Sequence, residues 1–400
     1  MEQNLSDHQP SVLHVTTGFP RTQGDVFGSF IADTLLTLSK RLPITVLAPG
    51  DHHAPQFENN GQLSVFRFPY WPFGQSRVAY GQGIPTNLKS WACRFQLPFF
   101  LMAFAWHIFK ESKGKDLIHA HWGISGVLAY FSSRIRGIPL VVSYHGSDLH
   151  GQALIRRASK WIATQSHANI CISKEQIDCL GTPSHLISYP LDTERFSPVS
   201  IEKANSLKSA WSLPSDQPLI LMVGYLIPLK KFDIAINAIS IMDQGHLIIA
   251  GDGGEKQALE ALVKNLNLKD RVTFLGSVPF HKIHELFQLS DLHFLCSERE
   301  GKPNVIFQAM ATGLPSLSTA IGGVPEQIDD NISGRLLPPE ATSFARASQE
   351  LLQDPNLKNK MGWQARSKLE NLGIDPQTIS QQIEEVYRNI LDHPPSTSDQ

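Results

Sequence analysis

Apolar and polar residues alternate along the chain with two different periods. Short apolar runs at 12–17 and 44–48 are typical of buried strands, whereas residues 25–40 between them carry apolar side chains at helical spacing. A strand, a helix and a second strand in succession predict a βαβ unit. We therefore expect the first half of the chain to be doubly wound α/β, with further strands at 63–68, 117–121, 140–144 and 170–172.

The second half shows the same pattern in a different sequence. Apolar runs predict strands at 219–223, 247–249, 272–275, 292–296 and 315–318, with helical patterns at 231–242, 255–266, 282–289 and 304–311. The stretch between the two series is polar and contains two prolines, which favours a linker. These patterns predict an α/β domain at 1–190, a linker at 191–205, a second α/β domain at 206–375, a helix at 376–392 and a disordered tail at 393–400.

Composition agrees with two domains and excludes some functions. Four hundred residues are too many for one compact core. A net charge of −2 argues against nucleic acid as the main partner, because a phosphate backbone asks for a basic excess. Four cysteines without paired metal spacing fit a reducing compartment, and the N-terminus lacks the pattern of a signal peptide. We expect a cytoplasmic protein.

The longest apolar run, 97–109, has two interpretations. Pro98 and His107 interrupt it, and it is too short to span a bilayer. It is either a buried or half-buried helix, or part of a surface that dips into the inner face of a membrane to meet a lipid-borne substrate. In the second case the aromatic loop at 70–73 would contribute to the same peripheral membrane contact.

The stretch 296–327 concentrates polar groups and glycines beside apolar elements. A polar loop at 297–302 follows a predicted strand, and Pro303 occupies the first position of the next helix. A second strand-to-helix turn follows at 322–326. In an open α/β sheet both turns lie at the carboxyl ends of the strands, where helix N-termini favour phosphate binding.

No nucleotide fingerprint of the common kinds is present. Neither the loop after the first strand nor Gly251–Gly254 has the G-x-G-x-x-G spacing, and there is no phosphate loop of the G-x-x-x-x-G-K-[ST] kind. The sequence therefore disfavours a nicotinamide or flavin enzyme. Sugar nucleotides are the leading ligand class.

Five blocks in the second half resemble a known enzyme family. They are, in order, 224–233, 251–253, 271–276, 300–305 with 309–311, and 322–326. In this order they resemble the retaining family 4 glycosyltransferases, whose GT-B fold has two Rossmann-like domains facing a central cleft. The first half resembles the family more loosely, through 19–24, 116–121 and 143–148.

The resemblance implies a reaction and its partners. Such enzymes move a sugar from a nucleotide diphosphate sugar to an acceptor hydroxyl with retention of configuration, without a metal cofactor. The second domain would bind the donor and the first a saccharide or lipid-linked acceptor, in polysaccharide or glycoconjugate biosynthesis. The helix at 376–392 would return to the first domain.

The resemblance also assigns roles to single residues. It gives catalytic positions to Lys230, which would neutralise the leaving diphosphate, to Glu300, which would contact the transferred sugar, and to His145, which would form hydrogen bonds beside it. His121 and Asp148 would lie on the acceptor side. The donor-binding set would comprise Gly24, Tyr225, Gly301, Lys302, Pro303, Asn304, Val305 and Gln308.

Two positions depart from the family pattern. Tyr225 stands where a second positive charge is common, and Gln308 stands where a second glutamate binds the ribose. An amide accepts a hydrogen bond more weakly than a carboxylate does. We expect Lys302 to replace part of the missing charge. His119 and His121 alternate on one strand face like metal ligands, but no cysteine or carboxylate spacing supports them, so no metal site is expected.

Three other functions remain open. A GT-B sugar-nucleotide epimerase or a phosphorylase would share the fold, and a non-catalytic binding or scaffold protein would explain Tyr225 and Gln308 as a decayed pocket. A transferase would release free nucleotide diphosphate only when an acceptor is present. A scaffold with a decayed pocket would bind no nucleotide diphosphate.

Overall fold

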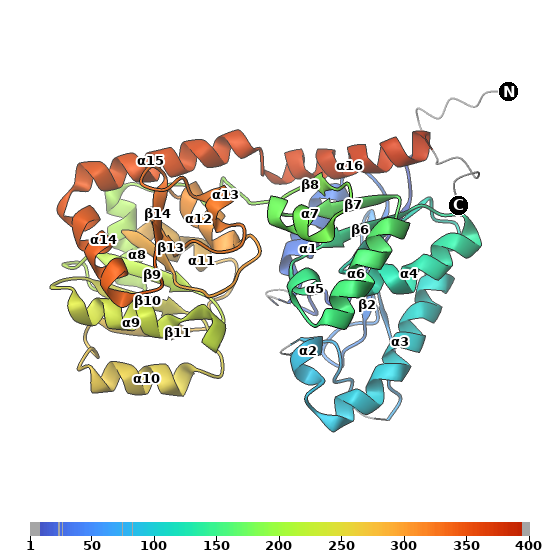
Figure 1. Ribbon diagram of the computed structural model, residues 1–400, viewed down its shortest axis with the longest axis horizontal. Helices are drawn as coiled ribbons and strands as arrows, with labels where there is room; N and C mark the ends of the chain where they lie inside the picture. Colours follow the sequence, from blue (N-terminus) through green and yellow to red (C-terminus); the bar gives the residue numbers. More distant parts are fainter. Residues whose placement is uncertain (1–8, 23–24, 26, 74, 82, 394–400) are drawn as a thin grey trace. The chain divides into compact units, whose positions relative to one another are not determined.

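The computed structural model describes residues 9–22, 25, 27–73, 75–81 and 83–393 (Figure 1). The chain forms two compact units. Unit 1 comprises Met1–Pro190 and Pro376–Gln400, and unit 2 comprises Leu191–Asp375. Each unit is built on its own sheet.

The sheet of unit 1 has eight strands in the order β3-β4-β2-β1-β5-β6-β7-β8. All neighbouring strands are parallel except β3 and β4. The strands are β1 Val12–Val15, β2 Ile44–Pro49, β3 Phe57–Asn60, β4 Leu63–Phe68, β5 Leu117–His121, β6 Leu140–Tyr144, β7 Ala168–Cys171 and β8 His185–Leu186. Strand order reverses at β1, because the chain builds outward from it in both directions.

Two groups of helices cover this sheet. Helix α1 packs against α16, while α3, α4 and α6 pack against one another. Side chains alternate along β1, so Leu13 and Val15 join the core under α3, and His14 points to the face covered by α1 and α16. The helices of unit 1 are α1 Ser29–Leu38, α2 Ile84–Asn87, α3 Trp91–Glu111, α4 Gly123–Arg136, α5 Ser147–His150, α6 Ala153–Gln165, α7 Lys174–Leu180 and α16 Pro376–Asp392.

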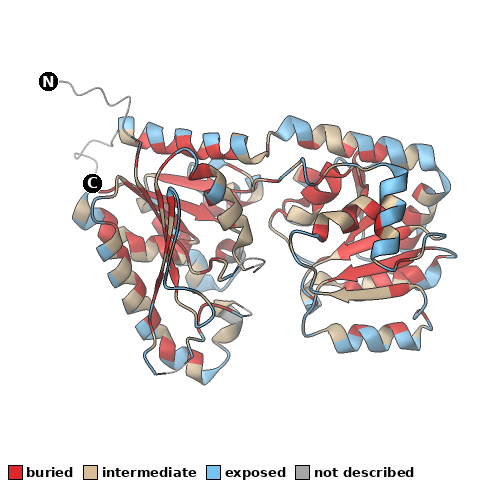
Figure 2. Cartoon of the chain, turned by 180° about the vertical axis from the view of Figure 1, so that it is seen from behind, coloured by how far each residue is buried: buried red, intermediate tan, exposed pale blue. Residues whose placement is uncertain are grey.

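Unit 2 is a six-stranded parallel sheet in the order β11-β10-β9-β12-β13-β14. Its strands are β9 Leu219–Val223, β10 His246–Ala250, β11 Val272–Gly276, β12 Leu292–Leu295, β13 Ser316–Thr319 and β14 Gly334–Leu337. Its helices are α8 Ile201–Ala210, η2 Pro228–Lys230, α9 Phe232–Ile241, α10 Lys256–Asn265, α11 Ile283–Leu289, α12 Asn304–Ala311, α13 Val324–Gln327, α14 Ala341–Gln353 and α15 Pro355–Leu372. The four inner strands are buried on both faces, the edge strands β11 and β14 are largely half-buried, and the helices expose their outer sides (Figure 2).

One part of the predicted layout changes, and one lies outside what the structure describes. Residues 191–205 are not a separate linker, because they lie within unit 2: the Leu191 N–H donates to Ile374 O over 2.9 Å, and Phe196 is buried against Phe287. The prolines mark a packed connection here, not a free one. The predicted tail at 393–400 lies, apart from His393, outside the described residues.

Helix α16 belongs to unit 1, as the resemblance implied, although it follows the last element of unit 2 in sequence. Its buried side chains include Ile379, Ile383 and Tyr387. The Glu384 carboxylate accepts hydrogen bonds from Arg41 and Arg388. Unit 1 is therefore completed by residues from the end of the chain.

Candidate functional site

The sheet of unit 2 changes direction between β9 and β12. From β9 the chain adds β10 and β11 on one side, and it then returns to add β12, β13 and β14 on the other. Open α/β sheets bind ligands beside the carboxyl ends of the strands at such a switch point. Lys230 ends the 3₁₀ turn η2 after β9, and Glu300 lies in the loop after β12.

Lys230 and Glu300 meet across this switch point. The Lys230 ammonium forms an ion pair with Glu300 Oε1, and Ser297 Oγ donates to the same oxygen over 2.7 Å. The side chains are 21% and 12% exposed, so the pair is shielded but reachable from solvent. One cation and one hydroxyl thus fix the orientation of the carboxylate, and the two predicted catalytic residues of unit 2 lie in contact.

The loop that carries Glu300 is tied to the loop after β13. Thr319 Oγ1 donates to Ser297 O over 2.7 Å, and the Gly323 N–H donates to Gly301 O over 2.6 Å. At Gly322, with φ at +49°, a Cβ atom would lie 1.9 Å from Glu300 O. Only glycine fits both the backbone conformation and this close approach. Gly322 thereby holds Glu300 in place, a role that sequence reasoning did not give it.

The other predicted donor-binding residues of unit 2 lie close to Lys230 or Glu300 in the sequence. Pro303 precedes α12 as its N-cap residue, and Asn304 and Val305 form its first turn. Within the described part of the chain no side chain caps this helix, which leaves its first N–H groups available to an anion. Gln308 is buried on the same helix, whereas Tyr225 is 58% exposed beyond β9.

Lys302 is buried beside the loop. Its ammonium lies 3.5 Å from the Glu326 carboxylate and 5.7 Å from the centre of the Phe307 ring. Glu326 offsets part of the charge that Lys302 was expected to supply. If Lys302 replaces part of the positive charge that is absent at Tyr225, Lys302→Ala should weaken donor binding. Unchanged donor affinity would show that Lys302 does not supply this charge.

We expect Gln308→Glu to tighten nucleotide binding. A carboxylate accepts ribose hydroxyl hydrogen bonds more strongly than an amide, by about 1–3 kcal/mol or about one to two decades in affinity. Calorimetry with a nucleoside diphosphate measures the change. Equal or weaker binding would mean that the amide is matched to this donor. The physical reason would be burial: Gln308 is only 8% exposed, so a carboxylate there must be desolvated, and this cost would offset its stronger hydrogen bond.

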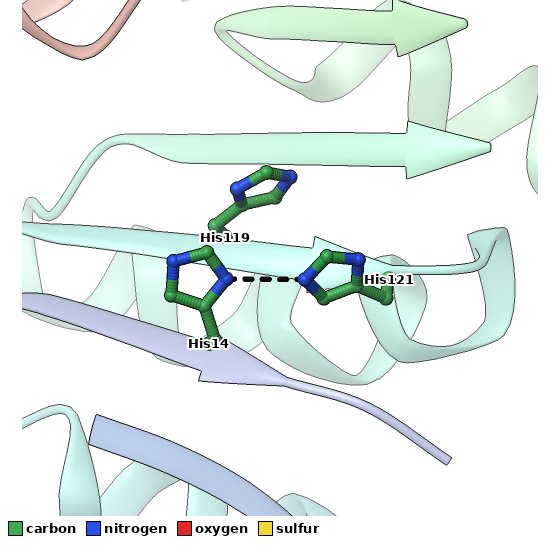
Figure 3. A group of neighbouring side chains, drawn as sticks. All are labelled: His14, His119 and His121. Atoms are coloured by element: carbon green, nitrogen blue, oxygen red, sulfur yellow. Dashed lines mark hydrogen bonds between the residues drawn. The ribbon is translucent and has the colours of Figure 1, made fainter. Parts of the chain in front are cut away.

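His145 of unit 1 follows β6 and contacts other buried polar side chains. Its Nε2 lies 3.1 Å from His121 Nδ1, and its Nδ1 lies 2.8 Å from the Tyr189 hydroxyl. His121 Nε2 in turn lies 3.1 Å from His14 Nδ1 (Figure 3). The predicted catalytic histidine and the predicted acceptor-side His121 are therefore direct neighbours.

These histidines lie beside a small cavity. It has a volume of about 40 Å³, room for one or two waters, and its lining includes His145, Tyr189 and Phe30 of α1. Burial lowers the pKa of His14, His119 and His145 well below the usual range and that of His121 to about 3. The imidazoles are therefore uncharged at neutral pH, and the predicted role of His145 is confined to hydrogen bonding, without a fixed positive charge.

His14 was missed by sequence reasoning. It pairs with His119 in the parallel register of β1 and β5, and that register cannot be deduced from a single histidine in a four-residue strand. Nitrogens of His14, His119 and His121 lie within 4.8 Å of one another, which is a donor set that could hold a metal. Their rings are inclined by only 17–43°, so the lone pairs do not converge well on one point.

Asp148 contacts backbone groups at the head of two helices. Its Oδ2 accepts from the Gly123 N–H over 3.1 Å and its Oδ1 from the His145 N–H over 3.3 Å. Burial raises the pKa of this carboxyl to about 6, although the N–H donors oppose the shift. Asp148 thus holds the loop that carries His145. Its predicted place on the acceptor side stays a prediction.

Raising the pH from about 4 to about 6 should cost the wild type stability relative to Asp148→Asn. The native carboxyl titrates near 6 and the unfolded one near 3.8, so in this window the native state binds the extra proton. The difference in unfolding free energy should fall by about 2–3 kcal/mol, measured by urea unfolding. A difference that is flat with pH would show that the N–H donors cancel the burial.

The remaining predicted residue, Gly24, lies outside the described residues. Of its described neighbours, Asp25 has a carboxylate that accepts from Arg21 Nε over 2.6 Å. Arg21 also lies 5.0 Å from the centre of the Tyr80 ring and 3.7 Å from Asp51. A cation beside the carboxyl end of β1 is a feature that the sequence did not single out.

Comparison with known proteins decides the family. Residues 29–195 match the model of Glycosyltransferase Family 4, and residues 204–368 match that of Glycosyl transferases group 1. The chain is a glycosyltransferase of this family. N-acetyl-alpha-D-glucosaminyl L-malate synthase of Bacillus anthracis is 27% identical over 315 residues, which are 74% of this chain and 81% of that protein.

Comparison with solved structures identifies the fold of this glycosyltransferase. The sucrose-phosphate synthase of Thermosynechococcus elongatus superimposes with a TM-score of 0.80 at 21% identity, over 96% of this chain and all of the other. The Anabaena protein HepE in complex with UDP-glucose gives 0.75 at 20% identity, over 95% and 100%. The two α/β domains are those of the GT-B fold, as the sequence predicted.

Proposed function

We propose that this glycosyltransferase moves a sugar from a nucleoside diphosphate sugar to a hydroxyl of a saccharide acceptor, with retention of configuration and without a metal cofactor. The observation that carries the proposal is the Lys230–Glu300 pair at the switch point of unit 2. The pair supports the proposal because it brings a cation, which suits a diphosphate, next to a carboxylate, which suits a sugar. Polysaccharide or glycoconjugate biosynthesis is the setting that this activity fits.

Charge stabilisation is the chemistry these residues supply. Lys230 and the uncapped N-terminus of α12 can neutralise a leaving diphosphate, which is the task a divalent ion performs elsewhere. Glu300 is oriented by Lys230 and Ser297 to meet the developing charge of the sugar. The nearby Cys296 thiol does not serve as a nucleophile, because burial raises its pKa well above the usual range.

Retention then requires the acceptor to attack from the side of the leaving group. No side chain is placed as a covalent nucleophile in this proposal, and the leaving phosphate takes the acceptor proton. Uridine diphosphate sugars are the first donors to test, since HepE is a fold neighbour that binds UDP-glucose.

A transfer assay in EDTA tests the reaction. The protein is incubated with uridine, guanosine or adenosine diphosphate sugars and a panel of saccharide acceptors, and free diphosphate and the anomeric configuration of the product are measured. Acceptor-dependent release with a retained anomer supports the proposal. Epimerised donor without release indicates an epimerase, and the absence of both donor binding and turnover indicates a scaffold with a decayed pocket.

We further propose that the enzyme works on a lipid-linked acceptor at the cytoplasmic face of an anionic membrane. Within the described residues, α3 is the one helix that reaches the length and apolar composition of a bilayer span. One side of α3 is buried in the core of unit 1 through Phe100, Phe104 and Ile108. A helix held this way lies along the surface of the unit, so it would rest on a membrane without crossing it.

The exposed side of α3 is aromatic. Trp91 and Trp106 are 80% and 64% exposed, with Phe95, Phe99 and Met102 between them. Trp71 and Phe73 extend this face, because Trp71 lies 5.4 Å from Phe99 and 5.6 Å from Phe73 between ring centres. We call this set the α3 face. It refines the surface predicted at 70–73 and 97–109, since Tyr70 is buried and the exposed stripe begins at Trp91.

Charge around the α3 face favours anionic lipid. The sequence from 70 to 113 contains five basic residues, Arg77, Lys89, Arg94, Lys110 and Lys113, and a single acidic one, Glu111. Basic residues beside a surface stripe of Trp and Phe are the pattern of a peripheral membrane contact. An aromatic face of this size is otherwise a liability for a protein in water.

Trp106→Gln combined with Phe95→Gln should lower binding to anionic vesicles by about tenfold or more, because each aromatic contributes apolar area in the interface. Sedimentation with phosphatidylglycerol vesicles measures it. Trp363→Gln, an equally exposed tryptophan of unit 2, is the control and should bind as wild type. Equal binding by all three proteins, or binding that resists alkaline carbonate as a spanning helix does, would contradict the proposal.

A further inference from the structure

Four histidines, two tyrosines and a serine of unit 1 form one continuous chain of hydrogen bonds. Its order is Ser143, His119, Tyr387, His14, His121, His145 and Tyr189. Strands β1, β5 and β6, the end of β6 and helix α16 contribute to it. Each imidazole uses both ring nitrogens, one toward each neighbour. Figure 3 shows three of the four rings, those of His14, His119 and His121.

An unbroken chain of neutral imidazoles can carry its protons in only two ways. A neutral imidazole has one N–H and one bare nitrogen, so it donates to one neighbour and accepts from the other. Among His14, His121 and His145, which bond directly to one another, the direction of one bond therefore sets the direction of the other. Tyr387, with a single O–H, can donate to only one of its neighbours His119 and His14. All four histidines are neutral because burial lowers their pKa values.

The bonds of the tyrosines select one of the two directions. Tyr387 Oη lies 2.5 Å from His119 Nδ1 and 3.3 Å from His14 Nε2. Tyr387 has one O–H, and hydrogen bonds donated by O–H are shorter than those donated by N–H, so of its two bonds it donates the shorter one to His119 and accepts the longer one from His14. The 2.7 Å between His119 Nε2 and Ser143 Oγ also lies in the range of an N–H donor, which agrees with His119 donating to Ser143. The Tyr189 hydroxyl, 2.8 Å from His145 Nδ1, then also donates, and burial keeps it protonated by raising its pKa.

We propose that the chain fixes His145 as the Nε2–H tautomer, with Nδ1 bare and facing the Tyr189 hydroxyl, and that His14, His121 and Tyr387 are positioning residues for it. In this direction all four histidines carry their proton on Nε2. His145 Nε2–H donates to His121, His121 Nε2–H to His14, and His14 Nε2–H to Tyr387.

The fixed tautomer determines what His145 can bind. A bare Nδ1 accepts a hydrogen bond, so its partner must be a donor, and a substrate hydroxyl can replace the Tyr189 hydroxyl there. An ionised phosphate has no proton to give and is a poor partner. Resting on the proposed function, this assigns His145 to a sugar hydroxyl and leaves the diphosphate to unit 2.

Nuclear magnetic resonance of protein labelled with ¹⁵N-histidine tests the tautomers without any assay of activity. We expect His14, His119, His121 and His145 to show a bare Nδ1 and a protonated Nε2 at neutral pH. A protonated Nδ1 on His145, or a charged imidazolium, would overturn the proposal. If His145→Ala leaves transfer unchanged while the tautomers are as stated, the catalytic role of His145 fails and the chain stands.

Tyr387→Phe tests the coupling with the loss of one hydroxyl, three hydrogen bonds away from His145. We expect the ¹⁵N shifts of His145 to move toward a mixture of tautomers and kcat to fall about three- to tenfold, with the donor KM unchanged. Tyr144→Phe is the control, since that buried hydroxyl contacts Ser159 O and Asn169 on the other face of the sheet. Unchanged His145 shifts in folded Tyr387→Phe would show that the chain does not couple.

Discussion

Glu300→Gln is expected to lower kcat of sugar transfer by about 100- to 1,000-fold while the protein remains folded. The change keeps the size of the side chain and removes the negative charge that would meet the developing charge of the sugar. It also removes the ionic partner of Lys230, so the ammonium is freed for the diphosphate. Donor affinity should therefore stay equal or rise, and initial rates over a range of donor concentrations separate the two effects.

Glu298→Gln is the matched control. Glu298 lies two residues away in the same loop, is 54% exposed, and pairs with Lys231 over 2.8 Å. An exposed pair of this kind contributes little, so the control should retain wild-type turnover. If both variants lose activity equally, the loop and not the Glu300 carboxylate is responsible. If Glu300→Gln is as active as wild type, Glu300 has no part in catalysis.

Lys230→Met should weaken binding of the nucleoside diphosphate by about 10- to 100-fold. A charge-assisted hydrogen bond to phosphate is worth about 1.5–3 kcal/mol, and methionine keeps the apolar stem. The variant should also lose turnover, because the leaving diphosphate is no longer neutralised. Calorimetry with the free diphosphate measures the first effect, and a transfer assay at saturating donor measures the second.

Lys231→Met controls for general loss of charge. Lys231 precedes α9 in the left-handed conformation, with φ at 52°, and its ammonium pairs with Glu298 and not with Glu300. Its replacement should leave diphosphate affinity within about twofold, since the lost interaction is a surface pair. Equal weakening by both variants would mean that the diphosphate senses only the net charge of the loop.

Much of the fold followed from the apolar pattern, for a clear reason. Buried parallel strands such as β9 and β10 are continuous apolar runs, and the helices between them repeat at their own period, so element type is readable from the sequence. The connection at 191–205 was misjudged, because proline and polar residues do not distinguish a free linker from a packed one. Phe196, buried within it, was the available signal.

The residues of the candidate site could be proposed from the sequence where they lie in motifs, but not where strand register or helix packing brings them together. Lys230 and Glu300 stand in blocks with a family resemblance, and the strand order brings them into contact. His14 and Tyr387 are 373 residues apart, and only the packing of α16 on the sheet joins them. The partner of Lys302, Glu326, was likewise hidden, since it comes from the next strand-to-helix turn.

The central claim is that Lys230 and Glu300 together bind a nucleoside diphosphate sugar without a metal. Calorimetric titration with uridine, guanosine and adenosine diphosphate sugars in EDTA tests this claim most directly. We predict that at least one donor binds the wild type with a micromolar Kd, that Lys230→Met weakens it, and that Lys231→Met does not. No binding by any donor, or binding that Lys230→Met leaves unchanged, would contradict the account.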